Sequence, residues 1–276
     1  MIKPLFILAL IVPFPVLYSS HFSPDFVVRY VNVDPNAVKN VEFAFLEGFE
    51  SPPIAPKSFC YVDFATAEDY RRYRNSSRYE NPPSFLGNVT PRNEHQYFVK
   101  VRDPGRLRIM YERIDLAKSR GFYGVFLDLA DYYVYRLDEY PDAYERFVYA
   151  IENVTVYAHS IGLKVVVNIG SALRYAYDLN VDGILREVVY FYMGEPVDEE
   201  YVSVVLEALY AAKSRGLWVF VVDEAVNLEE FMYAYSHLRD FYTFITDGDY
   251  DHMPRRYEGT NKYYFPFSRL LLYFSS

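Results

Sequence analysis

The segment GFYGVFLDLADYYVY, residues 121–135, carries an apolar run that ends in acids. Residues 125–127 have the character of a strand buried on both faces, and Asp128 follows them directly, with Asp131 close behind. In parallel α/β folds the carboxyl ends of strands open into the ligand crevice, so an acid there is placed to meet substrate. The alternative is a helix N-cap, a role that Asp fills well, but the following residues lead into an aromatic run. We therefore predict a chemical role for Asp128.

Strand-like and helix-like segments alternate along the chain, the pattern of repeated βα units around a parallel sheet. Eight strands are predicted, at residues 27–31, 41–46, 58–64, 124–128, 164–169, 183–187, 217–223 and 242–246. The clearest helical patterns are residues 104–119, 142–161, 199–215 and 228–237, the first with proline in its opening turn. This count predicts an α/β fold, a single (β/α)₈ TIM barrel.

Residues 68–96 break the alternation with prolines, charges and aromatic residues. We predict a long loop after the third strand. Long ordered loops in compact domains are usually functional, and on a barrel they lie over the catalytic face.

Polar residues end most of the predicted strands and would face one mouth of the barrel. They are Glu47, Asp128, Asn168, Glu187, Asp223 and Asp247. A glycoside hydrolase needs such converging acids, because one carboxyl donates a proton to the leaving oxygen while another attacks or activates water. Tyrosines just beyond the acids would serve as sugar platforms: Tyr132, Tyr133, Tyr190 and Tyr192.

The N-terminus has the pattern of a secretory signal. Met1-Ile2-Lys3 precedes the nearly all-apolar residues 5–12, and prolines and a Ser19-Ser20 pair follow. The apolar run is shorter than the ~20 residues of a membrane-spanning helix. We expect residues 1–20 to be a signal peptide, with an uncleaved anchor as the alternative, and residues 21–276 to form one catalytic barrel. The protein is then secreted or extracellular, and touches a membrane only through that N-terminal segment.

Charge and composition exclude several other classes of protein. With 28 Lys and Arg against 37 Asp and Glu, a formal charge of −9 argues against a nucleic-acid partner. Cys60 is the only cysteine, so no intrachain disulfide forms, and we expect it in the core. The histidines are scattered, which argues against a zinc site. The acids that begin at Asp247 have the spacing of an EF-hand calcium loop, but His252 stands where that loop requires glycine. We expect no metal and no cofactor.

Six segments in order resemble glycoside hydrolase family 114. They are ATAEDY (65–70), VRDP (101–104), GFYGVFLDLADYY, VVVNIG (165–170), VDGILREVVYFY (181–192) and VFVVDEA (219–225). The resemblance covers nearly the whole mature chain. It implies a (β/α)₈ barrel, secretion in many members, and an activity similar to endo-α-1,4-polygalactosaminidase, whose substrate is a polysaccharide.

The resemblance also implies a catalytic pair. The family's strand-four acid falls on Asp128 and its strand-six acid on Glu187. Because strand side chains alternate, Glu187 should point inward and Arg186 toward the outer helices. We assign Glu187 as proton donor and Asp128 as nucleophile or base. The reverse assignment stays open, and the alternative to catalysis is a structural salt bridge.

Further residues are predicted to contact substrate. Glu68, Asp69 and Tyr70 match a family block, although Ala65-Thr66-Ala67 replaces its usual opening and glycine. The alternative for Glu68 is helix capping. The other predicted contacts are Asp131, Asn168, Tyr190, Asp223 and Asp247.

For two of these residues the sequence predicts a specific kind of bond to the sugar. Asn168 would hydrogen-bond sugar, or else the loop backbone. Asp223 would hold a cationic amino sugar by a charge-assisted bond, or else pair with Lys or Arg.

Two departures from the family bear on substrate identity: the second strand ends in Leu46-Glu47-Gly48, and Lys100 lies in the block before Pro104. A lysine at the mouth would disfavour a polycationic chain. The sequence predicts a secreted hydrolase of α-glycosidic bonds in an amino-sugar-containing polysaccharide. The alternative is a non-catalytic glycan-binding or cell-envelope protein on the same barrel.

Overall fold

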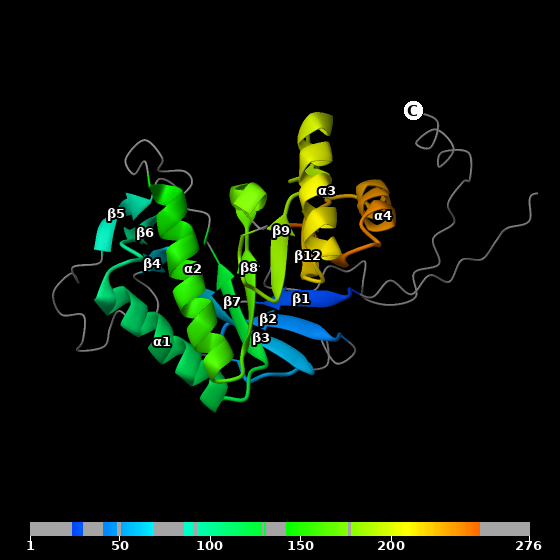
Figure 1. Ribbon diagram of the computed structural model, residues 1–276. Helices are drawn as coiled ribbons and strands as arrows, with labels where there is room; N and C mark the ends of the chain where they lie inside the picture. Colours follow the sequence, from blue (N-terminus) through cyan, green and yellow to red (C-terminus); the bar gives the residue numbers. More distant parts are fainter. Residues whose placement is uncertain are drawn as a thin grey trace, which may run out of the picture. The chain divides into compact units, whose positions relative to one another are not determined.

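The computed structural model describes residues 24–29, 41–48, 51–68, 86–90, 93–128, 130, 142–175 and 178–248. Its main sheet has eight parallel strands (Figure 1). In sheet order they are β1 (Phe26–Arg29), β2 (Phe43–Leu46), β3 (Lys57–Asp63), β7 (Gly124–Asp128), β8 (Lys164–Asn168), β9 (Gly183–Glu187), β12 (Trp218–Glu224) and β13 (Tyr242–Thr246). All eight predicted strands are present, with boundaries within two residues.

Asp25, just before β1, bonds to Thr243 of β13 and so joins the first and last strands of the barrel. The backbone N–H of Asp25 donates to the carbonyl of Thr243 at 3.2 Å, and the N–H of Thr243 donates to Asp25 Oδ2 at 2.9 Å. A carboxylate thus replaces the second backbone acceptor that a regular ladder would supply at this seam. The predicted α/β fold, a (β/α)₈ TIM barrel, is confirmed.

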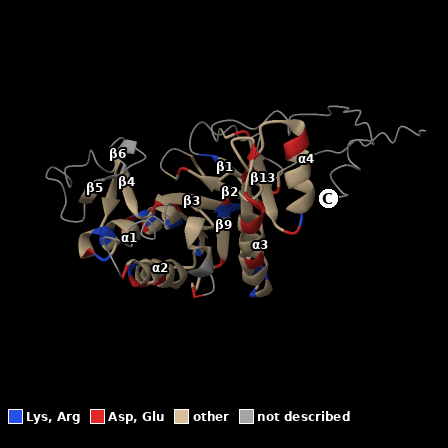
Figure 2. Ribbon diagram, turned by 90° about the horizontal axis from the view of Figure 1, so that it is seen from above, with Lys and Arg blue, Asp and Glu red and all other residues tan. Residues whose placement is uncertain are grey.

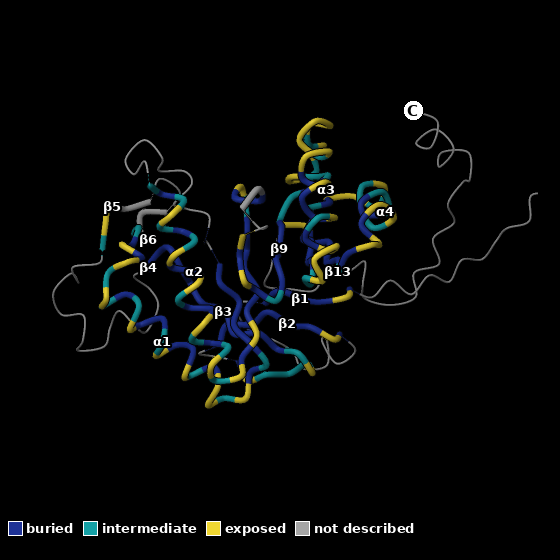
Figure 3. Tube along the Cα trace, viewed as in Figure 1, coloured by how far each residue is buried: buried dark blue, intermediate teal, exposed yellow. Residues whose placement is uncertain are grey.

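The barrel interior is filled by aromatic rings from alternate strand positions. Phe45 on β2 lies 5.5 Å from Phe26, 4.8 Å from Phe126 and 5.0 Å from Phe220, measured between ring centroids. These rings come from four different strands, so they define the inward face of each. Figure 3 shows the strands as the most buried part of the chain. Cys60 is also buried, as predicted.

The outer helices are α1 (Pro104–Ser119), α2 (Ala143–Ser160), α3 (Glu199–Ser214) and α4 (Leu228–His237). The N-cap of α1 is Asp103, which accepts from the N–H of Gly105 at 2.8 Å, and Asn227 forms a capping box with Glu230 at the start of α4. Acids occupy the first turns of α3 and α4 (Figure 2), where they complement the helix dipole. These helices match the predicted ones.

The segment predicted as a long loop after the third strand has a sheet of its own. β4 (Thr66–Glu68), β6 (Asn93–Val99) and β5 (Leu86–Thr90) form three antiparallel strands in the order β4, β6, β5. Two further short strands, β10 (Phe191–Tyr192) and β11 (Glu195–Pro196), pair after β9, and a short 3₁₀ helix (Gly170–Tyr175) follows β8.

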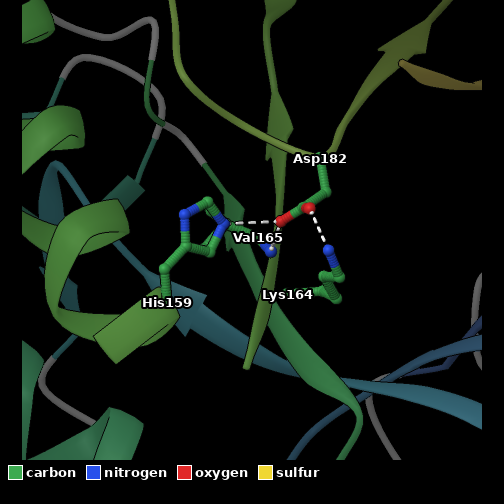
Figure 4. Close-up of polar contacts among 4 residues, drawn as sticks. All are labelled: His159, Lys164, Val165 and Asp182. Atoms are coloured by element: carbon green, nitrogen blue, oxygen red, sulfur yellow. Dashed lines mark hydrogen bonds and ion pairs between the residues drawn. The ribbon is translucent and has the colours of Figure 1, made fainter. Parts of the chain in front are cut away.

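A polar cluster ties the amino ends of β8 and β9 together, at the end of the barrel opposite the predicted mouth. Asp182 accepts from Lys164 Nζ at 2.7 Å and from the N–H of Val165 at 2.9 Å, and its Oδ2 lies 2.7 Å from His159 Nε2 (Figure 4). Burial opposes ionisation of Asp182, but these hydrogen bonds outweigh it and lower its pKa. In TIM barrels this end serves stability.

We expect Asp182→Asn to lower the melting temperature at pH 7 by on the order of 4 °C, because it removes the charge-assisted bonds of a mostly buried carboxylate. A lowered pKa stabilises the fold above the unfolded-state pKa of about 4, and that stability is lost as the pH falls through the folded-state value. The two melting curves should therefore converge below about pH 4. Thermal unfolding between pH 3 and pH 8 measures this, and a constant difference across that range would contradict it.

Candidate active site

Asp128 is the last residue of β7 and lies on its inward face. It is two residues beyond Phe126, whose ring packs in the barrel interior against Phe45. The strand begins with Gly124, where a Cβ would come within 2.5 Å of the Phe59 ring, so only glycine fits there. Asp128 is 7% exposed, so its side chain is largely shielded from solvent at the mouth of the barrel.

Glu187 is the last residue of β9, and its phasing follows from its neighbour. The Arg186 guanidinium lies 5.6 Å from the ring of Tyr201 on α3, so Arg186 faces the outer helices as predicted. Alternation then directs Glu187 inward. Glu187 is partly exposed, whereas Arg186 is buried.

Asn168 lies at the end of β8, the strand between β7 and β9. Its Nδ2 donates to Asp128 Oδ1 at 2.8 Å, and its Oδ1 accepts from the N–H of Gly170 at 3.3 Å. The bond to loop backbone, one of the two roles considered for this side chain, is thus present, and the bond to sugar stays a prediction. The Asn168 amide thus donates to the Asp128 carboxyl and ties it to the end of β8.

The residue after Glu187 is strained. Val188 has φ = 61°, in the left-handed region, where a β-branched residue is an outlier that costs roughly 1–3 kcal/mol. Its N–H donates to the carbonyl of Val222 on β12 at 2.8 Å. A strained turn thus directly follows the predicted proton donor.

Asp223 is fully buried and bonded to backbone. Its Oδ1 accepts from the N–H groups of Val189, Tyr190 and Phe191 at 2.8, 3.0 and 3.2 Å. Burial raises its pKa to about 6, although the three N–H donors act the other way. In this conformation the carboxylate holds the loop after β9 and has no exposed surface for a ligand.

Glu224 is a mouth acid that the sequence analysis missed. It shares the inward face of β12 with Phe220 and Val222, since these positions alternate with Asp223. Its Oε2 accepts from the N–H of Met193 at 3.1 Å, and burial raises its pKa. Counting alternate positions from the aromatic residues of this strand would have selected it.

Asp63 at the end of β3 was also missed as a mouth acid. It is fully buried, its Cα is the register partner of Asp128, and its Oδ1 accepts from the hydroxyl and the N–H of Thr66. The sequence signal was the same as for Asp128, an acid that ends an apolar strand.

The other predicted mouth residues are spread around the rim. Glu47 is buried just after β2, and Asp247 is exposed just after β13. The ring of Tyr190 packs against Tyr233 and His237 of α4, at 5.4 and 5.5 Å between centroids, and burial raises the pKa of Tyr190 to about 12.

Glu68 is the last residue of β4, where it is the register partner of Gln96. Asp69, Tyr70 and Asp131 lie outside the described residues, as do Tyr132 and Tyr133. Their roles stay predictions.

The described ranges contain no group of three His, Cys, Asp or Glu side chains placed to hold a metal ion. Within those same ranges, none of the helices combines the length and hydropathy needed to cross a bilayer.

Curated relatives match part of this chain. A protein of Methanocaldococcus jannaschii is 31% identical over 175 residues, 59% of this chain and 50% of that protein. A protein of Thermotoga maritima is 30% identical over 125 residues, 39% of each chain. The matched region thus spans half or less of these relatives' own length.

Solved structures share the fold. The glycoside hydrolase domain of PelA from Pseudomonas aeruginosa matches with a TM-score of 0.67 at 15% identity, over 82% of this chain and 96% of that chain. Aspergillus fumigatus Ega3 in complex with galactosamine matches with a TM-score of 0.63 at 14% identity, over 83% and 93%. At these identities the likeness concerns the fold.

The family model described as glycoside-hydrolase family GH114 matches residues 34–260, which include both strand-end acids, Asp128 and Glu187. Matched over most of its length, the chain belongs to glycoside-hydrolase family GH114.

Proposed function

We propose that this protein is an endo-acting glycoside hydrolase that cleaves α-glycosidic bonds in an amino-sugar-containing polysaccharide. Glu187 would donate the proton to the leaving glycosidic oxygen. Asp128 would attack the anomeric carbon or take a proton from the attacking water.

The proposal rests on the placement of two acids in a GH114 barrel. Each acid ends a barrel strand and lies on the inward face of that strand. Asp128 ends β7, Glu187 ends β9, and Asn168 on the strand between them is bonded to Asp128. Two carboxyls over one mouth are what acid-assisted glycosidic cleavage requires.

The amino-sugar substrate is supported by the solved structure of Ega3, a similar barrel in complex with galactosamine. It is also consistent with the chain's acidic balance, a formal charge of −9, which favours cationic ligands. Further sugar contacts are proposed for Glu68, Asp69, Tyr70, Asp131, Tyr190 and Asp247, together with a hydrogen bond from Asn168.

We further propose that the protein is exported, on the basis of the signal-like residues 1–20. An exported, cleaved chain would have a new N-terminus near residue 21. N-terminal sequencing of the protein recovered from the medium and from membranes tests this, and recovery of the intact N-terminus on membranes would favour the anchor.

The function is tested by release of reducing ends from a panel of polymers: galactosaminoglycan and glucosaminoglycan, each with and without N-acetyl groups, and a neutral α-glucan. An endo-hydrolase lowers polymer viscosity well before it has released many reducing ends. We expect activity on a galactosamine polymer and none on neutral glucan. A protein inert on the whole panel that still binds one polymer would be a non-catalytic glycan-binding protein.

A further inference from the structure

Most of the backbone N–H groups in the loop after Glu187 bond to three consecutive residues of β12. The N–H of Val188 bonds to the carbonyl of Val222, the next three N–H groups bond to Asp223 Oδ1, and the N–H groups of Met193 and Gly194 bond to Oε2 and the carbonyl of Glu224. Six backbone donors between Val188 and Gly194 thus find their acceptors on one strand end.

The three donors on Asp223 form an anion-binding concavity. The three successive N–H groups converge on one oxygen, and the turn that carries them begins at Val188, whose φ of 61° lies in the left-handed region. Such a nest ordinarily binds an external anion. Here a carboxylate of the neighbouring strand occupies it, and the same residues carry the strain of the turn.

We propose that Asp223 is a positioning residue for Glu187: its bonds to residues 189–191, which we call the Asp223 clamp, hold the strained turn that directs the Glu187 side chain into the mouth. The proposal rests on the proposed function for its catalytic meaning. Its structural content, the coupling of Asp223 to the direction of Glu187, stands independently of activity.

The geometry explains why a residue that has no exposed surface affects the site. Without the carboxylate, three N–H groups beneath the mouth lose their acceptor, and of the bonds to β12 only those of Val188, Met193 and Gly194 then oppose relaxation of the positive φ. The backbone would relax toward negative φ. Because Glu187 directly precedes this turn at the end of β9, relaxation of the turn would shift that strand end and the Glu187 side chain with it, and a displacement of about 1 Å at a catalytic group costs about 100-fold in rate.

Two variants and one matched control test the proposal. Asp223→Ala removes the acceptor, whereas Asp223→Asn keeps an oxygen in place without the charge. The control is Asp182→Asn, which removes an aspartate that accepts a backbone N–H between neighbouring strands at the other end of the barrel.

The first readout is structural and needs no substrate. In a crystal structure of Asp223→Ala, we expect Val188 to leave the positive φ region and the Glu187 carboxyl to move by about 1 Å or more relative to the wild-type crystal, whereas Asp223→Asn, which keeps an acceptor oxygen, should show a smaller shift in the same direction. Val188 and Glu187 in their wild-type positions in both variants would overturn the proposal. If Asp223→Ala does not fold, Asp223→Asn alone decides.

The second readout is kinetic, at a temperature well below the melting point of every variant. We expect Asp223→Ala to lose about 100-fold in kcat with KM changed less than threefold, and Asp223→Asn to recover roughly tenfold of that loss. Asp182→Asn should keep wild-type kcat despite its lower melting temperature. Wild-type kcat in Asp223→Ala would show that the clamp serves stability alone and would overturn the proposal.

The two failures are distinct. A wild-type protein inert on every polymer removes the proposed function, and the crystal structures of the variants then still decide whether Asp223 sets the direction of Glu187.

Discussion

Replacing either mouth acid by its amide is expected to reduce kcat by about 1,000-fold or more, a loss of roughly 4 kcal/mol of transition-state stabilisation. Asp128→Asn and Glu187→Gln keep the size and the polar shape of the side chain and remove only its ability to exchange a proton or attack carbon. Rates of reducing-end release on the preferred polymer measure the effect. Circular dichroism and melting temperature establish that both variants fold.

The two variants should differ in a way that assigns their roles. A missing proton donor matters little when the leaving group needs no proton, so Glu187→Gln should regain most of its rate on an aryl glycoside with an acidic phenol. Asp128→Asn should stay slow on the same substrate. The opposite outcome would exchange the roles, and full activity of either variant on the polymer would remove that residue from the chemistry.

Arg106→Met is expected to destabilise the fold by about 3 to 5 kcal/mol, a large part of the 5 to 15 kcal/mol by which most domains are stable. Arg106 on α1 is 1% exposed, and its Nη2 donates to the carbonyl oxygens of Asp63, Phe64 and Thr66 at 2.6, 2.9 and 2.9 Å. Methionine fills similar volume but leaves these carbonyls without that donor. The midpoint of urea unfolding measures the loss.

The same helix provides the control. Arg108 is exposed and makes only a long ion pair with Glu112, at 3.9 Å, so Arg108→Met should change stability by about 0.5 kcal/mol or less. Equal effects of the two substitutions would show that the Arg106 bonds contribute little. Because Asp63 is the register partner of Asp128, Arg106→Met should also lower activity in whatever fraction folds.

The barrel could be predicted from sequence because its signals are local. Runs such as residues 125–127 and 165–167 are apolar without alternation, the pattern of strands buried on both faces, and the aspartate before α1 and the proline at its first position mark a helix start. The antiparallel sheet formed by β4, β5 and β6 was predicted as a loop, because turn residues and charges dominate that segment and its pairing is visible only in space.

The site residues likewise divide into those that a local sequence pattern indicates and those that only the folded structure reveals. Asp128 and Glu187 were predicted because they end strands, and the structure places both on inward faces. On β12 the prediction selected Asp223, whereas alternation along the strand places Glu224, one residue later, on the inward face. Nothing in the sequence near Arg106 indicates that it reaches carbonyls about 40 residues earlier in the chain. Contacts of that kind depend on the assembled fold.

The seam between β1 and β13 has a consequence for how the protein forms. The bond from Thr243 to Asp25 joins positions 218 residues apart, so the last strand must be synthesised before the first can find its second neighbour. Closing so long a loop is slow, and until then the edge of β1 is an open template for pairing with other chains. A growing chain of this topology therefore stays prone to strand pairing with other chains until its last strand has been made.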